Sequence, residues 1–274
     1  MTRPPSDTHC PALRIVVLGS GSSGNATAIA YDGTLVLVDC GFSARETANR
    51  LSTAGLEPAE VSAILVTHEH GDHVKGIDVF ARRYAPGCTV YATPGTLRRM
   101  ALNRSVECRC ADVVDGFSVG ALSVHSFETS HDAAQPVGYR IEAGGDVFGV
   151  ATDSGVLTPA ALDGLRDATV LGLEFNHDVD MLERGPYPYH LKRRILSEQG
   201  HLSNADAASA LERLAHGGLN RVIALHRSHT NNTADLAAGA LRAALERLGH
   251  PAAAEVARQH GVSVPAAPCV PTEG

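Results

Sequence analysis

The feature that most constrains this chain is a group of four candidate metal ligands packed into six residues: His68, His70, Asp72 and His73. The group follows the apolar run 63–66, which predicts a buried strand, and precedes a helical pattern that begins near Val74. A loop can turn residues with these spacings inward together, whereas a strand would point the first and the last of them to opposite faces. Imidazole and carboxylate groups are ligands that zinc, manganese and iron accept, so the sequence predicts a metal site at the end of this strand.

This His-x-His-x-Asp-His pattern closely resembles the signature of the metallo-β-lactamase superfamily, whose members place the loop at a strand end and build a two-metal hydrolytic centre on it. The resemblance implies three further ligands, and a candidate lies beside a strand-like run in each expected context: His131, Asp153 and His226. Taken singly, each of these would more often be an ordinary polar residue at a strand end. The superfamily pattern assigns one metal to His68, His70 and His131, the other to Asp72, His73 and His226, and places Asp153 between them.

Helical and strand patterns alternate along the chain in two comparable halves, which predicts an α/β fold of two sheets packed face to face with helices outside. The resemblance implies the four-layer αββα sandwich of the superfamily. Helices are predicted between 43 and 55 and at 74–85, 94–102, 159–166, 204–216 and 233–248. Strands are predicted at 14–18, 26–31, 34–38, 63–66, 89–92, within 106–151, at 168–174 and at 220–226. We expect a disordered lead over residues 1–12, a single domain over 13–250 and a disordered tail over 251–274.

Residues 19–25 form a Gly/Ser-rich run that matches the G-x-G-x-x-G pattern of dinucleotide-binding sites. That pattern requires a helix to begin at its last glycine, whereas here two strand-like runs flank Asp32 and Gly33 as they do in a hairpin. We therefore expect no nucleotide-cofactor site, but a loop beside the metal centre whose backbone N–H groups meet substrate. Asp39, at the end of the hairpin, is expected to hydrogen-bond the back of a ligand imidazole.

The formal net charge of −7 argues against unspecific coating of nucleic acid, which needs a broad positive surface, but it leaves room for a local basic patch. Six cysteines are scattered without a C-x-x-C pair, so reduced thiols are expected. No apolar run approaches the ~20 residues of a membrane span, and the first residues lack the apolar core of a signal peptide. These features predict a globular cytoplasmic protein without a membrane partner.

Several segments that are not needed to hold metals resemble the YycJ/WalJ-like group of the superfamily, bacterial metallohydrolases regarded as DNA exonucleases. They are residues 19–25, 174–178, 181–195, 200–204 and 231–232. Glu174 and His201 also resemble the Glu/His pair of ribonuclease Z, a nucleic-acid phosphodiesterase of the same superfamily, although Glu174 could equally be a helix-cap or salt-bridge carboxylate. The chain departs from the group at Arg227 to His229, which leaves the role of His229 open.

The resemblance implies a hydrolase that uses two divalent metals, zinc or manganese, and a bridging hydroxide to cleave phosphodiester bonds in DNA. Its catalytic residues would be Asp72, His201 and Glu174. The alternative is a thioester or lactone hydrolase of the glyoxalase II type, which uses the same ligand set. A redox di-iron enzyme would carry Glu at the position of His70, and a non-catalytic signalling partner would not need the complete ligand set.

The segment from Arg184 to Arg194 is a candidate substrate-binding region, with four candidate contacts: Tyr187, Lys192, Arg193 and Arg194. Cations can meet phosphates, and a tyrosine ring can stack on an unpaired base for about 1–3 kcal/mol. The competing interpretation is a solvated helix face with buried tyrosines, because short basic runs are common on helix surfaces. The position of the segment between Glu174 and His201 favours the substrate-binding interpretation.

Overall fold

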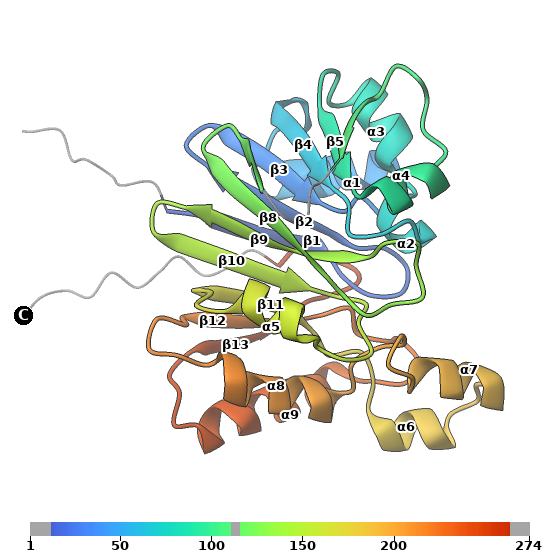
Figure 1. Ribbon diagram of the computed structural model, residues 1–274, viewed down its shortest axis with the longest axis vertical. Helices are drawn as coiled ribbons and strands as arrows, with labels where there is room; N and C mark the ends of the chain where they lie inside the picture. The colour runs from blue at the N-terminus through green and yellow to red at the C-terminus, as the bar shows by residue number, and fades with distance from the viewer. Residues whose placement is uncertain (1–11, 111–115, 264–274) are drawn as a thin grey trace, which may run out of the picture.

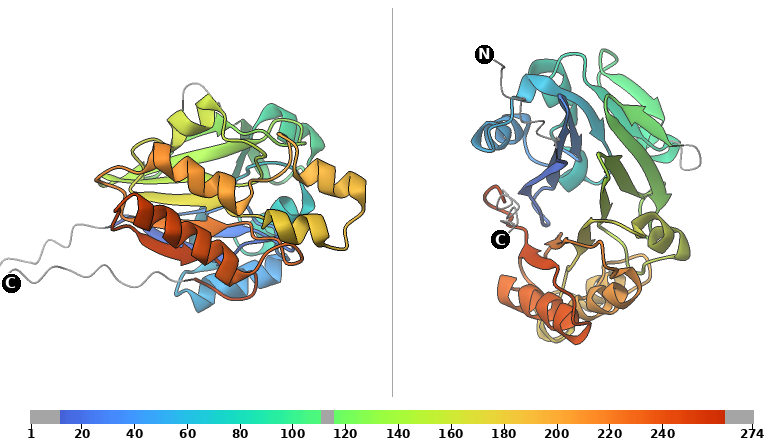
Figure 2. Two further views of the ribbon diagram at one scale, coloured as in Figure 1. Left: turned by 90° about the horizontal axis from the view of Figure 1, so that it is seen from below. Right: turned by 90° about the vertical axis from the view of Figure 1, so that its left-hand side faces the viewer.

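The computed structural model describes residues 12–110 and 116–263, and in it two β-sheets pack face to face with helices on both outer surfaces (Figure 1). Figure 2 shows the four layers from the side, which confirms the predicted αββα sandwich. Helices α1, α3 and α4 cover one sheet, and α5, α8 and α9 cover the other. In the part of the chain that the structure describes, no helix is both long and apolar enough to cross a membrane.

Among the described residues, the first sheet has six strands in sequence order. They are β1 (Arg14–Gly19), β2 (Ala26–Tyr31), β3 (Thr34–Val38), β4 (Val61–Leu65), β5 (Thr89–Ala92) and β6 (Glu107–Cys110). The first three are antiparallel, and β3 to β6 run parallel. Tyr31 pairs with Thr34 across the two-residue turn, so the predicted hairpin is confirmed and no helix follows the Gly/Ser loop.

The second sheet has seven described strands, in the order β13-β12-β11-β10-β9-β8-β7. They are β7 (Phe117–Val119), β8 (Leu122–Glu128), β9 (Val137–Ala143), β10 (Asp146–Ala151), β11 (Val170–Glu174), β12 (Arg221–Leu225) and β13 (Ala253–Val256). Strands β10 to β13 are parallel. Parallel strands end at the same edge of a sheet, so the loops that follow β10, β11 and β12 meet there.

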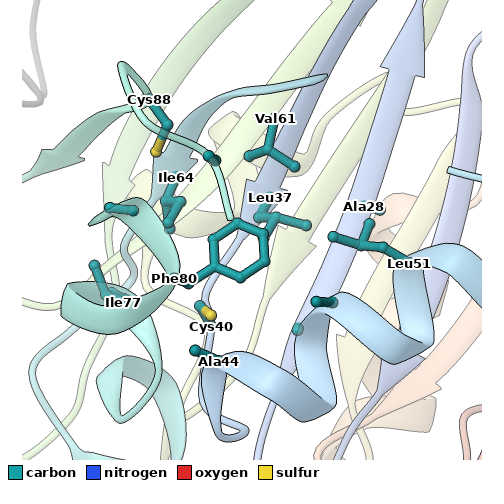
Figure 3. Close-up of a cluster of buried hydrophobic side chains, with 14 of the residues drawn as sticks. Ala28, Leu37, Cys40, Ala44, Leu51, Val61, Ile64, Ile77, Phe80 and Cys88 are labelled. Carbon is teal, nitrogen blue, oxygen red and sulfur yellow. The ribbon is translucent and has the colours of Figure 1, made fainter. Parts of the chain in front are cut away.

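Three buried apolar clusters match the layers. The middle cluster fills the space between the sheets with residues such as Ile29 of β2 and Tyr139 of β9. The second lies between the first sheet and its helices, where Phe80 of α3 points toward Leu37 and Ile64 (Figure 3). The third joins the other sheet to α5, α8 and α9. These side chains are almost completely buried, and each Å² of apolar surface removed from water stabilises the fold by about 25 cal/mol. This packing is the main contribution that keeps the strand ends in their places.

Helices α1, α4, α5, α8 and α9 begin close to the predicted positions, whereas α6 and α7 were not predicted. The bounds of the described helices are α1 (Ala44–Thr53), α2 (Gly71–Val74), α3 (Ile77–Arg83), α4 (Pro94–Arg99), α5 (Pro159–Leu165), α6 (Val179–Arg184), α7 (Tyr189–Ile195), α8 (Asn204–Leu214) and α9 (Ala234–Arg247), with a short 3₁₀ turn at Pro58–Glu60. The single helix predicted over 74–85 is instead broken between α2 and α3. Gly76 marks the break because its backbone packs against the earlier segment before α1: a Cβ there would lie 2.3 Å from the carbonyl oxygen of Phe42.

The expectation of disorder from residue 251 onward is wrong for its first part. Ala253–Val256 forms β13, which pairs in parallel with β12, and Ser263 bridges to Val17 of β1. The run has no apolar periodicity, so its strand depends on the hydrogen bonds that the neighbouring strand supplies. Residues 1–11 and 264–274, which cover most of the expected lead and the rest of the expected tail, lie outside the described residues.

Candidate metal centre

Seven predicted ligands meet at the edge where the parallel strands end. His68, His70, Asp72 and His73 lie in the loop after β4 and in α2, whose first residue follows His70. The other three come from the second sheet: His131 from the loop after β8, Asp153 from the end of β10 and His226 from the end of β12. The two sheets thus contribute to one site although the ligands span 158 sequence positions, from 68 to 226.

The two ligand groups that the superfamily resemblance implies both occur among the side-chain clusters, and a further cluster of His68, His73 and Asp153 connects them. The ligand atoms of His68, His70 and His131 all lie within 4.8 Å of one another, and so do those of Asp72, His73 and His226. In the first group Nε2 of His131 lies 3.3 Å from Nδ1 of His70. In the second, Oδ2 of Asp72 lies 3.6 Å from Nε2 of His73 and 3.4 Å from Nε2 of His226.

Asp153 lies between the two groups. Its Oδ2 is 3.2 Å from Nε2 of His73, and its Oδ1 is 3.9 Å from Nε2 of His131. Asp153 and His226 have positive φ angles of 55° and 50°, which are uncommon for residues with a side chain. Such backbone strain is concentrated at functional sites, and here it turns both side chains from their strands into the site.

Two of the ligand imidazoles, His73 and His131, are held from behind. Oδ2 of Asp39 lies 2.7 Å from Nδ1 of His73, as the sequence predicts, and the same carboxylate accepts hydrogen bonds from the backbone N–H and the hydroxyl of Thr67. The backbone carbonyl of Gly200 lies 3.1 Å from Nδ1 of His131. These contacts fix which ring nitrogen faces the site, because an imidazole that donates through Nδ1 presents Nε2.

Glu174 occupies the centre of a buried network. Its Oε1 lies 2.9 Å from Nδ1 of His201 and 2.9 Å from Nδ1 of His226, while Oε2 accepts from the backbone N–H groups of Ser154 and Leu202. Burial would raise the pKa of Glu174, but its neighbours, His201 above all, lower it to about 2, so this carboxyl is ionised. The contact with His226 comes from the fold, since β11 and β12 end side by side and Glu174 is paired with Leu225.

The donor set suits divalent cations. Burial lowers the pKa of His68 well below its usual value, so its imidazole is neutral, and its buried Nε2 has no hydrogen-bond partner among the described residues. The buried Oδ2 of Asp153, 3.2 Å from Nε2 of His73, can offer a carboxylate lone pair beside it. Unsatisfied buried polar atoms are costly, and neutral imidazole nitrogens with a carboxylate oxygen are a ligand set for zinc or manganese.

Buried carboxylates give the site a strong attraction for positive charge. Burial alone would lower the pKa of His73, but Asp153 and Asp39 outweigh it and raise that pKa to about 10. The pKa of His226 is raised in the same way, by Asp153, Asp72 and Glu174 against its burial. Carboxylates that hold protons on these imidazoles would attract a metal cation equally well, and the cation would displace the protons.

The ligands open into one cavity. It is lined by His201 and by five of the candidate ligands, His70, Asp72, His131, Asp153 and His226, and also by Ser22, Asn176 and Ser228. Helix α7 and the residues before it contribute Tyr187, Leu191, Arg194 and Ile195. His201, which is paired with Glu174, therefore faces the same space as the candidate metal ligands.

The four predicted substrate contacts lie differently with respect to this cavity. Tyr187 and Arg194 line it, and Nη2 of Arg194 lies 2.5 Å from Oδ2 of Asp132, the residue after a candidate ligand. Lys192 and Arg193 are not among the cavity residues. Nζ of Lys192 donates to the carbonyl oxygen of Glu183, and the guanidinium carbon of Arg193 lies 6.0 Å from the centre of the Tyr189 ring.

The Gly/Ser loop has contacts that sequence reasoning did not identify. The hydroxyl of Ser20 accepts a hydrogen bond from the backbone N–H of His226, and Nδ2 of Asn25 lies 3.1 Å from Nε2 of His73. From the sequence, the position of the loop after a strand indicated only that it lies near the metal centre, and not that it contacts ligand residues. His229, whose role the sequence left open, is exposed and lies outside the residues that line the cavity.

Comparisons with known proteins agree with this geometry. Residues 34–227 match the model of a family described as the beta-lactamase superfamily domain. The chain is 36% identical over 241 residues to exodeoxyribonuclease YycJ of Bacillus anthracis, an alignment that covers 86% of this chain and 90% of the relative. It is 34% identical to exodeoxyribonuclease WalJ of Streptococcus pneumoniae, with 81% and 84% covered. The metallo-β-lactamase fold protein YhfI of Bacillus subtilis has a similar fold, with a TM-score of 0.72 at 15% identity over 92% of this chain and 98% of that one.

Proposed function

This chain belongs to the metallo-β-lactamase superfamily and to its YycJ/WalJ-like group, and on that premise we propose that it is a metal-dependent exonuclease that hydrolyses phosphodiester bonds in DNA. The observation that carries the proposal is the juxtaposition of two parts in one cavity: the paired ligand groups and the Glu174–His201 pair. Relatives named exodeoxyribonucleases, aligned over most of both chains, support DNA as the substrate. A DNA substrate also supports the cytoplasm as the place of action.

We assign the cations to the two ligand groups described above. His68, His70 and His131 would hold one, Asp72, His73 and His226 would hold the other, and Asp153 would contact both. Divalent cations bound there supply Lewis-acid chemistry, which activates water near neutral pH and neutralises charge that builds on a phosphate. We favour zinc or manganese because the donors are imidazole and carboxylate without a thiolate.

We assign His201 to the leaving group. Glu174 orients the ring through Nδ1, and the imidazole faces the cavity in which a scissile phosphate would bind. A proton held on this imidazole can pass to the leaving oxygen as the phosphorus–oxygen bond breaks, an effect worth about 10²–10⁴ in rate. Burial of Glu174 keeps water from competing for its carboxylate, so the pair stays fixed in one geometry.

We assign Tyr187 and Arg194 to the strand end in the cavity. The ring of Tyr187 can stack on a terminal base, and Arg194 can meet a phosphate next to the scissile one. Lys192 and Arg193 lie on α7 but outside the residues that line the cavity, so they would meet phosphates that extend out of it. Their role is long-range attraction, which is sensitive to salt.

The proposal is tested with purified protein of measured metal content on end-labelled DNA beside a thioester substrate. We expect stepwise shortening of the DNA that stops when a chelator removes the metal. Turnover of the thioester without cleavage of DNA would reject the nuclease and favour a glyoxalase II-type hydrolase.

A further inference from the structure

The Gly/Ser loop at the mouth of the cavity is held from behind by the C-terminal segment 257–263. This segment crosses from the second sheet to the first: the N–H of Ala257 donates to the carbonyl of Ala224, and the N–H of Ser263 donates to the carbonyl of Val17. On the way, the carbonyl of Arg258 accepts a hydrogen bond from the N–H of Ser20. The segment therefore connects the edges of both sheets next to the loop.

Gln259 makes the most specific contact within this segment. Its side-chain Oε1 accepts from the N–H of Ser23 at 2.9 Å, and its Nε2 donates to the carbonyl of Gly24, also at 2.9 Å. One amide thus satisfies a donor and an acceptor of the same tight turn. The backbone carbonyl of Gln259 is fixed in addition by Arg50, whose Nη1 lies 3.0 Å away.

The turn fits closely against Gln259 and against the loop that follows β12. Gly21 has φ +142°, and a Cβ at this position would lie 2.6 Å from Oε1 of Gln259 and 3.0 Å from the carbonyl oxygen of Arg227. A side chain here would therefore displace the Gln259 amide. Gln259 lies 238 positions after Gly21 in the chain. The close approach indicates that glycine at position 21 is needed for the loop to accept the Gln259 side chain.

The opposite side of the same turn faces the catalytic cavity. Ser22 lines the cavity and is exposed, while its neighbours Ser20 and Asn25 contact His226 and His73 as described above. The turn is thus bounded by Gln259 behind and by the substrate space in front. Hydroxyl and backbone N–H groups on such a turn are suited to phosphate oxygens of a nucleic-acid strand.

We infer that Gln259 is a positioning residue that fixes the turn at 21–24 so that Ser22 contacts the sugar-phosphate backbone of the bound DNA strand. This inference rests on the proposed function. Gln259 contacts none of the candidate metal ligands, so its effect is on strand binding and not on the chemical step. Glutamine suits this role because both a donor and an acceptor are needed at the end of one side chain.

The experiment compares wild-type protein with Gln259→Met, which keeps the length of the side chain and removes both hydrogen bonds, and with Gln259→Ala. The exposed neighbour His260 provides the control His260→Ala. Three quantities are measured: metal content, hydrogen exchange of the Ser23 amide, and KM and kcat on single-stranded DNA. In both Gln259 variants we expect unchanged metal content, exchange at Ser23 faster by about threefold to tenfold, and a rise in KM of similar size, with kcat within about twofold. The control should match the wild type in all three.

Unchanged exchange at Ser23 in both Gln259 variants would overturn the positioning role. Faster exchange with an unchanged KM would overturn the contact between the turn and DNA. A wild-type protein that cleaves no DNA would reject the proposed function and with it the DNA contact, whereas amide exchange would still decide whether Gln259 holds the turn.

Discussion

Nδ1 of His226 lies 2.9 Å from Oε1 of Glu174, the same oxygen that lies 2.9 Å from Nδ1 of His201. One buried carboxylate therefore orients both a candidate metal ligand and the proposed general acid. Metal binding and proton donation to the leaving group thus both depend on Oε1 of Glu174. Variants of the three residues should separate these two functions.

Replacing Glu174 should damage both functions. Glu174→Gln keeps the size of the side chain but removes the charge that orients the two imidazoles, so we expect metal affinity to fall by about 10–100-fold and activity to fall with it. Metal content after dialysis against a graded series of free metal measures the first effect. Glu212→Gln on the exposed face of α8 is the control. Unaltered metal affinity in Glu174→Gln would show that the contact with His226 does not support binding.

Replacing His201 should affect only one function. His201→Ala should keep both metal ions and should slow cleavage of DNA by about 10²–10⁴. Cleavage of a nitrophenyl phosphodiester should slow far less, because nitrophenolate leaves without a proton. Equal losses on the two substrates would remove the general-acid role and leave His201 as a structural residue.

Asp153 should be required for both metal ions. Because it lies between the two ligand groups, Asp153→Ala should reduce metal content below the about two ions per chain expected for the wild type, and activity should fall in parallel. Elemental analysis of purified protein gives the measurement. Asp163→Asn, an exposed position on α5, is the control. Full metal content in Asp153→Ala would contradict the bridging assignment.

The basic residues of α7 should govern how salt affects DNA binding. Replacing Lys192 and Arg193 with Gln should raise KM for DNA and should reduce the slope of log KM against log salt by about 0.7 per lost phosphate contact. Turnover of the small nitrophenyl diester should change little, because it offers no flanking phosphates. Replacement of the exposed Arg242 and Arg247 on α9 serves as a matched loss of charge. An unaltered slope would instead indicate that Lys192 and Arg193 lie on a solvated helix face and do not contact DNA.

Arg194 should behave differently from its two neighbours. It lines the cavity and pairs with Asp132 beside His131, so Arg194→Gln should lower kcat as well as raise KM. The comparison of Arg194→Gln with the Lys192 and Arg193 variant, on the same DNA, measures this difference. Identical effects on kcat and KM in the two variants would contradict a role for Arg194 inside the cavity.

The sequence predicted those parts of the molecule that depend on local pattern. The ligand loop, the hairpin from β2 to β3 and helices α1 and α8, capped by Ser43 and Ser203, have short-range signals, namely ligand spacing, turn residues and caps. The break at Gly76 was missed because its cause is tertiary: the backbone there packs against Phe42, far back in the chain.

Contacts between distant segments could not be predicted in this way. Strand β13 has no periodic pattern and exists because β12 offers an unpaired edge. Gln259 reads as an ordinary polar residue in an irregular tail, and its role becomes visible only when the fold brings it to Ser23. The same holds for Glu174 and His226, which are joined because β11 and β12 end at the same edge of one sheet.

The most direct test of the proposed exonuclease compares linear single-stranded DNA with a covalently closed circle of the same sequence, at equal metal and salt. We predict that the wild type shortens the linear strand to mononucleotides and leaves the circle intact, and that His201→Ala is slow on the linear strand. Cleavage of the circle at a comparable rate would contradict an enzyme that acts from a strand end, and a linear strand that stays intact with the metal site filled would contradict the nuclease itself.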